Sequence, residues 1–389
     1  MLMKNVINAL GRKNLIILAL LLALTLGAMG CFVGIHALSR MLPSQLAAER
    51  WQGESEIDYA QISCFIPVDE TVTLNEIAAF REAAMMRLHE AALDIDTGEQ
   101  VLMADAWSCT EKVSVSSALG KGEVYATAVG GEYFAFHPIR LISGSYISAS
   151  DLMQDRALLD EDTAWLLFGS TNIQGMSFKI NGVPFLVAGV IEREDDFASK
   201  KAYTAGMGIF ISYDAYSTLL SAESAAAPAS SDTANATAAA TSAPGIQCYE
   251  LILPNPVKNF ALNLVKEKFP IGRGEIVNNT ERFTLSNLRS LLKSFDTRSM
   301  QTSGVIYPYW ENASRGAEDR AVLLLLLGCV LLAPPVIAAL ILAVRYAVRG
   351  KRALEDDLMP RLKENAEEAI RVRARRRWEK QHGYIDDDE

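Results

Sequence analysis

Two short acidic clusters are the residues of this chain best suited to chemistry. One covers residues 160–162, and the other lies within residues 192–196, where four of the five residues are acidic. Neighbouring carboxylates can bind Ca²⁺ or work together as a general acid and base. The whole chain carries a formal net charge of -10, however, and solvated loops on an acidic surface produce the same pattern. We therefore expect loops rather than a site.

Other catalytic patterns are missing from the sequence. Gly120-Lys121-Gly122 lacks the upstream glycine and the following Ser or Thr of a phosphate-binding loop. The sequence contains no GxSxG or HExxH motif. None of its four histidines has a metal ligand or nucleophile at useful spacing: His36, His89, His137 and His382. The sequence therefore predicts a protein that is not an enzyme, with no cofactor and no metal.

Cysteine use is sparse. Cys31 and Cys329 lie in apolar runs, which leaves Cys64, Cys109 and Cys248 elsewhere. An odd number excludes a complete disulfide framework. Cys64 and Cys248 lie in strand-like segments and could pair if those strands were neighbours, but we expect buried free thiols.

Two long apolar runs frame the chain, one from Asn14 to Leu38 and one from Ala321 to Val344. Each has about 24 residues without Asp, Glu, Lys or Arg, which is enough to cross a bilayer as a helix. We predict transmembrane helices at 14–38 and 319–344. A cleaved signal peptide or a lipidated Cys31 are the alternatives for the first run. Its length and the apolar residues after Cys31 favour a retained anchor.

Basic residues flank the outer ends of both runs and predict the topology. Lys4, Arg12 and Lys13 precede the first run, and Arg345 and Arg349 begin the segment after the second. The positive-inside rule then places 1–13 and the charged tail 345–389 in the cytoplasm of a plasma-membrane protein. Residues 39–318 would form an extracytoplasmic domain. Its charge of about -14 argues against nucleic acid and against an anionic lipid surface as its partner.

Residues 221–245 consist almost wholly of Ala, Ser, Thr and Pro. A segment of this composition cannot bury a core, so we expect a disordered linker. Strand-like sequence on both sides indicates an excursion from one folded domain, and a boundary between two domains is the alternative.

The rest of the central domain mixes strands with helices. A strand at 57–68, a helix at 73–93 and a strand at 101–115 give a β-α-β opening. Asn181-Gly182 between two alternating runs predicts a hairpin. A strand at 248–253 and helices at 256–269 and 285–295 follow the linker, and we expect Ser286 to cap the last helix. The pattern predicts an α+β domain with two subdomains.

The stretch from Val124 to Ile191 resembles the extracytoplasmic core domain of MacB-like ABC transporter permeases. The matching phrases are Tyr133-Phe134, Ile139 to Leu141, Gly144, Leu166 to Gly169, and Gly175 to Val190. The resemblance implies a βαβ porter-like subdomain, from 57–115 and from 248 onward, plus a mostly β inserted subdomain at about 131–220. It also implies a non-catalytic domain that relays movement between a cytoplasmic ABC ATPase and events outside the membrane.

A second resemblance lies where the chain enters the second apolar run. Pro308 to Arg315 and Glu318 to Arg320 look like the helix that leads from the core domain into the membrane in some of these permeases. An interfacial helix with an aromatic belt at residues 307–310 is the simpler alternative. Pro334-Pro335 would kink the span. The basic run 371–380 could lie on lipid, dock an ATPase or be a charged helix. The candidate coupling residues are Trp310, Glu311, Asn312, Arg315, Glu318, Asp319, Pro334, Pro335, Arg375, Arg376 and Arg377.

One feature departs from the family pattern. Full permeases of this kind have three spans after the domain, whereas this sequence has a single apolar run there. We therefore expect a shortened two-span variant that lacks the full FtsX-like membrane core and works as an accessory subunit with an ABC ATPase, a multi-span permease or both. A two-span sensor is the competing class, although the tail is short for a signalling module. A membrane-tethered ligand-binding protein is another, and an apolar cleft with few charges would favour it.

Overall fold

The computed structural model describes residues 2–91, 102–148, 151–195, 197–202, 206–226, 245–294, 304–353 and 359–382. The chain divides into two compact units. One is Val33–Leu325, and the other combines Met1–Phe32 with Leu326–Glu389. The first contains the folded domain, and the second contains most of the apolar helical sequence.

Three long helices account for the second unit and its connections to the domain. They are α1 (Leu2–Met41), α11 (Tyr309–Ala353) and α12 (Met359–His382). Within α1 and α11, the segments Arg12–Met41 and Tyr309–Arg352 are long and apolar enough to cross a membrane. The two helices approach closely at small residues, since a Cβ on Gly328 would lie 3.3 Å from Cys31 Cβ.

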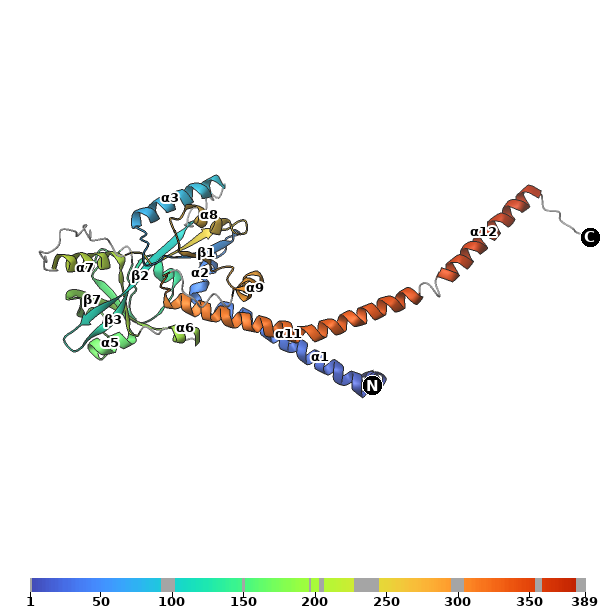
Figure 1. Ribbon diagram of the computed structural model, residues 1–389, viewed down its shortest axis with the longest axis horizontal. Coiled ribbons are helices and arrows are strands. Elements are labelled where there is room, and N and C mark those ends of the chain that lie inside the picture. Colours follow the sequence, from blue (N-terminus) through green and yellow to red (C-terminus); the bar gives the residue numbers. More distant parts are fainter. Residues whose placement is uncertain are drawn as a thin grey trace, which may run out of the picture. The chain divides into compact units, whose positions relative to one another are not determined.

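A ten-stranded mixed sheet forms the centre of the domain (Figure 1). Its order is β10-β1-β9-β2-β3-β8-β5-β7-β4, and β6 pairs with both β2 and β7. The pairs β3–β8 and β5–β7 are parallel, whereas the other described pairs are antiparallel. The strands are β1 (Tyr59–Phe65), β2 (Ala104–Ser116), β3 (Lys121–Gly131), β4 (Arg140–Gly144), β5 (Arg156–Asp160), β6 (Ser177–Ile180), β7 (Val183–Glu192), β8 (Gly208–Ser212), β9 (Cys248–Pro254) and β10 (Glu275–Asn278).

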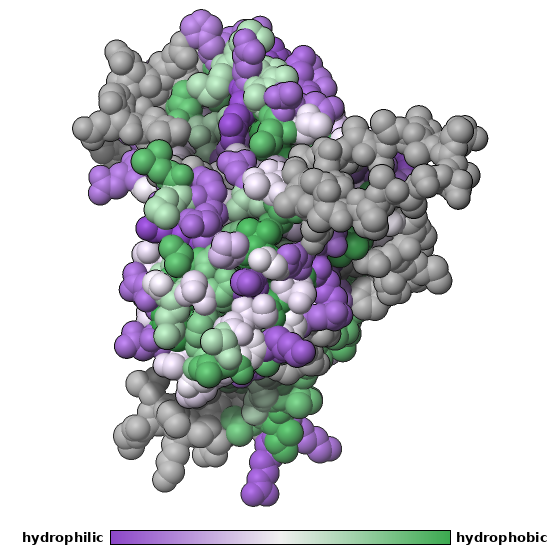
Figure 2. All heavy atoms as spheres, turned by 90° about the vertical axis from the view of Figure 1, so that its left-hand side faces the viewer, coloured by the Kyte–Doolittle hydropathy of each residue, from purple (hydrophilic) through white to green (hydrophobic). Residues whose placement is uncertain are grey.

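The sheet has two halves, and the long β2–β3 hairpin joins them. In the half formed by β10, β1, β9 and β2, helices α3 (Leu74–Glu90) and α8 (Phe260–Lys268) pack against each other and onto the strands (Figure 1). In the other half, α5 (Glu161–Phe168) and α7 (Tyr213–Ala226) contact β3, β5 and β8. This arrangement confirms the predicted α+β class, with a βαβ-rich part and a mostly β part. Figure 2 looks onto the end that carries α5 and α7, where hydrophobic and hydrophilic residues are interspersed.

Local sequence signals explain several elements. Thr73 caps α3 in a capping box, in which its side chain accepts from the Glu76 amide and the Glu76 side chain accepts from the Thr73 amide. Asn181 and Gly182 both have positive φ, 47° and 86°, as a two-residue type I′ hairpin requires.

Other local predictions were wrong. Thr284, not Ser286, is the N-cap residue of α9 (Leu285–Lys293), and α8 begins at Phe260 rather than near 256. Strand β10 was not predicted. Helix α7 continues to Ala226, so residues 221–226 of the predicted linker are helical. The rest of that prediction, 227–244, lies outside the described residues.

The two faces of the sheet differ in chemistry, because successive side chains of a strand point to opposite faces. One face carries Ile62, Cys64 and Tyr249 into the main apolar core beneath α3 and α8. The opposite face carries Gln61, Ser63, Glu250, Ser108 and Thr110, and we call it the polar face. It is covered by α2 (Ala47–Gln52), α4 (Tyr133–Phe136) and the first turns of α11.

This alternation also shows whether Cys64 and Cys248 are placed to form a disulfide. Cys64 lies opposite Tyr249 in the β1–β9 register, and Cys248 lies opposite Phe65. Cys64 therefore points into the apolar core, whereas Cys248 points to the polar face. Both are buried free thiols, as is Cys109. Burial raises the pKa of the Cys109 thiol to about 12.

Candidate functional site: the base of helix α11

The first turn of α11 is inserted against the polar face of the sheet. Trp310 has a relative exposure of only 3%. Its ring centroid lies 5.7 Å from that of Phe65 on β1 and 4.6 Å from that of His137, which follows α4. A buried aromatic side chain of this size contributes a large apolar contact area. Trp310 thus fixes the start of α11 to two elements of the domain.

Arg282 lies in the segment between β10 and α9, and it joins two carboxylates of α11. Its Nη2 atom lies 2.6 Å from Glu311 Oε2, and its Nη1 atom lies 3.4 Å from Glu318 Oε1. The three side chains have relative exposures of 1%, 0% and 8%, respectively. Burial alone would lower the pKa of Arg282, but the two carboxylates reverse this effect, and the net pKa is raised. The guanidinium therefore stays charged between two turns of the helix.

Arg315 forms a second junction at the same place. Its Nε atom donates to Glu311 Oε1 at 2.7 Å, and its Nη2 atom donates to Glu275 Oε2 of β10 at 2.7 Å. The guanidinium also lies over the ring of Tyr307, with Cζ 3.9 Å from the centroid. Burial tends to raise the pKa of Glu275, but the Tyr307 hydroxyl and Arg315 outweigh burial and lower it.

Hydrogen bonds extend from Arg282 and Asn279, which follow β10, to β1 and β9. Arg282 donates to Asn279 Oδ1 at 2.8 Å, and Asn279 donates to Ser63 Oγ at 2.7 Å. Ser63 donates to Glu250 Oε1 at 2.9 Å, and the other oxygen of Glu250 contacts His137 Nε2. We call this series, from Arg282 to His137, the buried polar chain. Each of its members is at most 3% exposed, so breaking one link leaves a buried polar group unpaired.

The predicted coupling residues divide into two groups. Trp310, Glu311, Arg315 and Glu318 meet at the base of α11, as described above. Asn312 is exposed and donates to the Tyr307 carbonyl at 3.2 Å, and Asp319 is half-buried in the same helix.

The other predicted coupling residues lie in the other unit of the chain. Pro334 and Pro335 are inside α11, which is helical throughout. Arg375, Arg376 and Arg377 are exposed on α12, where Arg375 pairs with Glu379 at 3.2 Å. Nothing in their surroundings assigns these residues a role.

Sequence reasoning missed most partners of α11. Arg282, Glu275 and Asn279 lie in a polar stretch that reads as a surface loop, and no local signal marks them as buried. The expectation of solvated loops was also wrong for Asp160, which is 1% exposed. Asp160 caps α5 by accepting from the Thr163 amide at 2.7 Å, and it pairs with Arg193. It is therefore structural. The described residues include no group of three or more His, Cys, Asp or Glu that could hold a metal ion.

Comparison with solved structures finds several similar domains. The periplasmic region of MacB from Actinobacillus actinomycetemcomitans is similar, with 13% identity, coverage of 62% of this chain and 94% of that chain, and a TM-score of 0.36. The extracellular domain of the noncanonic ABC-type transporter YknZ from Gram-positive bacteria is similar at 11% identity, over 64% and 100% of the two chains, with a TM-score of 0.33. A domain of a putative permease protein from Porphyromonas gingivalis is similar at 12% identity, over 59% and 95%, with a TM-score of 0.29.

No curated protein matches the chain. The family model for the MacB-like periplasmic core domain, however, matches residues 22–243, which is more than half of the chain. This match agrees with the two apolar helices that flank the domain. The chain is therefore a membrane protein of the MacB-like periplasmic core domain family, with an extracytoplasmic domain of the kind found in ABC transporter permeases.

Proposed function

We propose that this protein is a non-catalytic membrane subunit of an ABC export or mechanotransmission complex. Its extracytoplasmic domain passes conformational change through α11 to the membrane. The observation that carries this proposal is the position of Arg282, which pairs with Glu311 and Glu318 inside the domain. Both carboxylates belong to the helix whose later residues form the second apolar run.

Buried ion pairs are suited to transmission because they favour one arrangement of the two elements. An apolar contact tolerates a small slide, whereas a slide between Arg282 and Glu311 would break a buried ion pair, at a cost of about 3–5 kcal/mol. A movement of β10 would therefore take the base of α11 with it or break the junction. Arg315 strengthens the same link, since it joins Glu311 on the helix to Glu275 on β10.

The proposal includes a topology for the chain in the membrane. Residues 1–13 and 345–389 lie in the cytoplasm, 14–38 and 319–344 cross the bilayer, and 39–318 face outward. The energy for movement comes from an ABC ATPase, the kind of partner with which MacB-like permeases work. The exposed arginines of α12, Arg375 to Arg377, are available to that ATPase on the cytoplasmic side.

Co-purification tests this proposal. The tagged full-length chain is crosslinked gently in membranes of its own host, purified in mild detergent, and its partners are identified by mass spectrometry. An ABC ATPase or a multi-span permease is the expected partner. A signalling kinase, or the chain alone as a stable oligomer, would contradict the proposal. A reporter fused after residue 389 tests the topology in parallel, and its activity in the cytoplasm is expected.

A further inference from the structure

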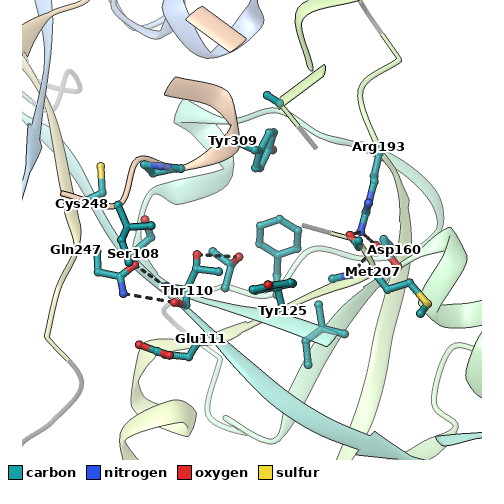
Figure 3. Close-up of a pocket in the computed structure, with 18 of the residues that line it drawn as sticks. Ser108, Thr110, Glu111, Tyr125, Asp160, Arg193, Met207, Gln247, Cys248 and Tyr309 are labelled. Carbon is teal, nitrogen blue, oxygen red and sulfur yellow. Dashed lines mark hydrogen bonds and ion pairs between the residues drawn. The ribbon is translucent and has the colours of Figure 1, made fainter. Parts of the chain in front are cut away.

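A cleft of about 510 Å³ opens on the polar face, next to the base of α11 (Figure 3). Its floor is formed by β2, β3 and β8, and its roof is the segment 306–309 with Asn312. This volume lies within the range of about 300–1,000 Å³ that small-molecule sites occupy. The cleft is separate from the buried polar chain, which runs through β10, β1 and β9.

The floor presents hydroxyl groups that lack protein partners. Ser108 is 4% exposed, and its hydroxyl has no hydrogen-bond partner among the described residues. The same holds for the Tyr125 hydroxyl within the described part of the chain. Ser108 is almost fully buried as a residue and lines this space. Its hydroxyl and that of Tyr125 are therefore free to hydrogen-bond to a molecule in the cleft.

Two ion pairs border the cleft, and Glu111, which also lines it, is an exposed carboxylate with no ion pair among the described residues. Asp160 pairs with Arg193 at one end, as Figure 3 shows, and it also accepts from the Gly208 amide at 2.6 Å. Lys112 pairs with Glu123 near the mouth. An anionic ligand would meet Glu111 and would have to break one of these pairs or be buried without a counter-charge, which is costly. The charge pattern therefore disfavours an anionic ligand, and the apolar walls favour an uncharged one.

The walls supply the apolar contacts. Tyr133 and Phe210 are 2% and 7% exposed, and their ring centroids lie 6.0 Å apart. Ile191 and Met207 also line the cleft, and Tyr309 faces it from the roof (Figure 3). Aromatic and aliphatic walls around a few polar groups are typical of sites for amphipathic organic molecules.

We propose that the cleft binds an uncharged amphipathic molecule. Its apolar body packs against Tyr133, Phe210 and Tyr309, and a hydroxyl or carbonyl group bonds to Ser108 and Tyr125. Because the roof is the segment that leads into α11, an occupant contacts the sheet and the start of α11 together. The proposal goes beyond the relay function and does not depend on any ATPase.

Photolabelling of the purified full-length chain in nanodiscs tests this proposal with a matched pair of probes. Benzophenone is uncharged and has an aromatic body with one carbonyl group. 4-Benzoylbenzoate adds only a carboxylate to it. After irradiation, peptides that contain Tyr125 or Met207 are quantified by mass spectrometry against peptides from the apolar helices, which report partition into lipid. We expect benzophenone to label the cleft peptides, and 4-benzoylbenzoate to label them about tenfold less.

Filling the cleft provides a second comparison. Ser108→Phe and Thr127→Phe fill it from two neighbouring strands, and each should lower cleft labelling about tenfold. Ser114→Phe is the matched control, because Ser114 is exposed farther along β2, and labelling should not change. If a filling variant fails to fold, the difference in labelling between the two probes on the wild-type chain still tests whether the cleft binds an uncharged molecule. Absence of cleft labelling, or equal labelling by both probes, would overturn the proposal.

Discussion

Arg282 and Glu311 form an ion pair in the interior of the domain, with Nη2 and Oε2 separated by 2.6 Å and side chains that are 1% and 0% exposed. The two residues are distant in sequence, and one lies between β10 and α9 while the other lies in the first turn of α11. Buried pairs of this kind add little net stability compared with apolar residues, but they penalise any misalignment. The pair therefore fixes the register of α11 against the sheet.

Removing the charge of Arg282 should destabilise the domain strongly. Arg282→Met removes the buried guanidinium that pairs with Glu311 and Glu318 and leaves Glu311 with Arg315, which should cost about 3–5 kcal/mol in the free energy of unfolding. Arg273→Met is the matched control. Arg273 also pairs with a carboxylate, but its side chain is 68% exposed, so a change below about 1 kcal/mol is expected. Denaturant unfolding measures the free energy of unfolding of both purified variants. Equal losses of stability would contradict the role of Arg282 as a buried ion-pair partner.

The triple variant Arg282→Met/Glu311→Gln/Glu318→Gln should recover part of the stability lost by Arg282→Met alone. It removes both carboxylates together with the arginine, and the cost of burial is far smaller for an amide than for a carboxylate. The same unfolding measurement compares the two variants. A triple variant less stable than the single one would show that Arg282 contributes by packing and not by charge.

Trp310 should be a major packing residue at the base of α11. Trp310→Ala removes contacts with Phe65 and His137 and should lower stability by about 3–5 kcal/mol. Trp165→Ala is the control in the same domain, because Trp165 is 56% exposed on α5, and it should change stability by about 0.5 kcal/mol or less. Thermal unfolding followed by circular dichroism distinguishes the two.

Acidification should weaken the junction through Glu275. Its pKa is lowered in the folded domain, so the folded state binds a proton at this group less readily than the unfolded state does. The stabilisation is therefore complete above the ordinary glutamate pKa and is lost as the pH falls through the lowered value. Glu275→Gln should be less stable than the wild type at pH 7, and the difference in their free energies of unfolding should narrow on acidification. If this difference stays constant down to about pH 3, below the ordinary glutamate pKa, the lowered pKa of Glu275 is contradicted.

The three thiols buried in the extramembrane domain, Cys64, Cys109 and Cys248, should resist both oxidation and alkylation in the folded protein. Burial raises the pKa of Cys64 and of Cys248, which keeps them as unreactive thiols, and the two point to opposite faces of the sheet. Iodoacetamide should modify Cys64, Cys109 and Cys248 only after denaturant is added, as mass spectrometry would show. A disulfide between Cys64 and Cys248 under non-reducing conditions would contradict the strand register.

The sequence predicted the elements that local patterns control. The helix after Thr73 and the hairpin at Asn181-Gly182 each depend on residues close together in the chain, so the residue types alone indicate the structure. The pattern of strands and helices indicated the α+β class, and the likeness around Val124 to Ile191 indicated the family. Trp310, Glu311 and Arg315 became candidates because Pro308 to Arg315 resembles the helix that leads from the core domain into the membrane in some of these permeases.

The partners of those residues could not be predicted, because tertiary contacts alone bury them. Arg282 and Asn279 belong to a polar stretch, and Ser63 and Glu250 look like ordinary strand residues on a solvated face. Only when α11 covers the polar face do these side chains become buried and pair with one another. Asp160 shows the same limit, since its acidic neighbours suggest a surface loop while its own carboxylate caps α5.

ATP hydrolysis by the reconstituted complex tests the central claim most directly. The co-purified ABC ATPase would be assayed in nanodiscs with the wild-type chain, with the triple variant Arg282→Met/Glu311→Gln/Glu318→Gln and with Arg273→Met, after assembly is confirmed for each. We predict that the wild type and Arg273→Met change the rate of ATP hydrolysis equally. The triple variant should assemble with the ATPase, but the change in rate that it causes should be about tenfold smaller. An unchanged effect in the fully assembled triple variant would contradict transmission through the base of α11.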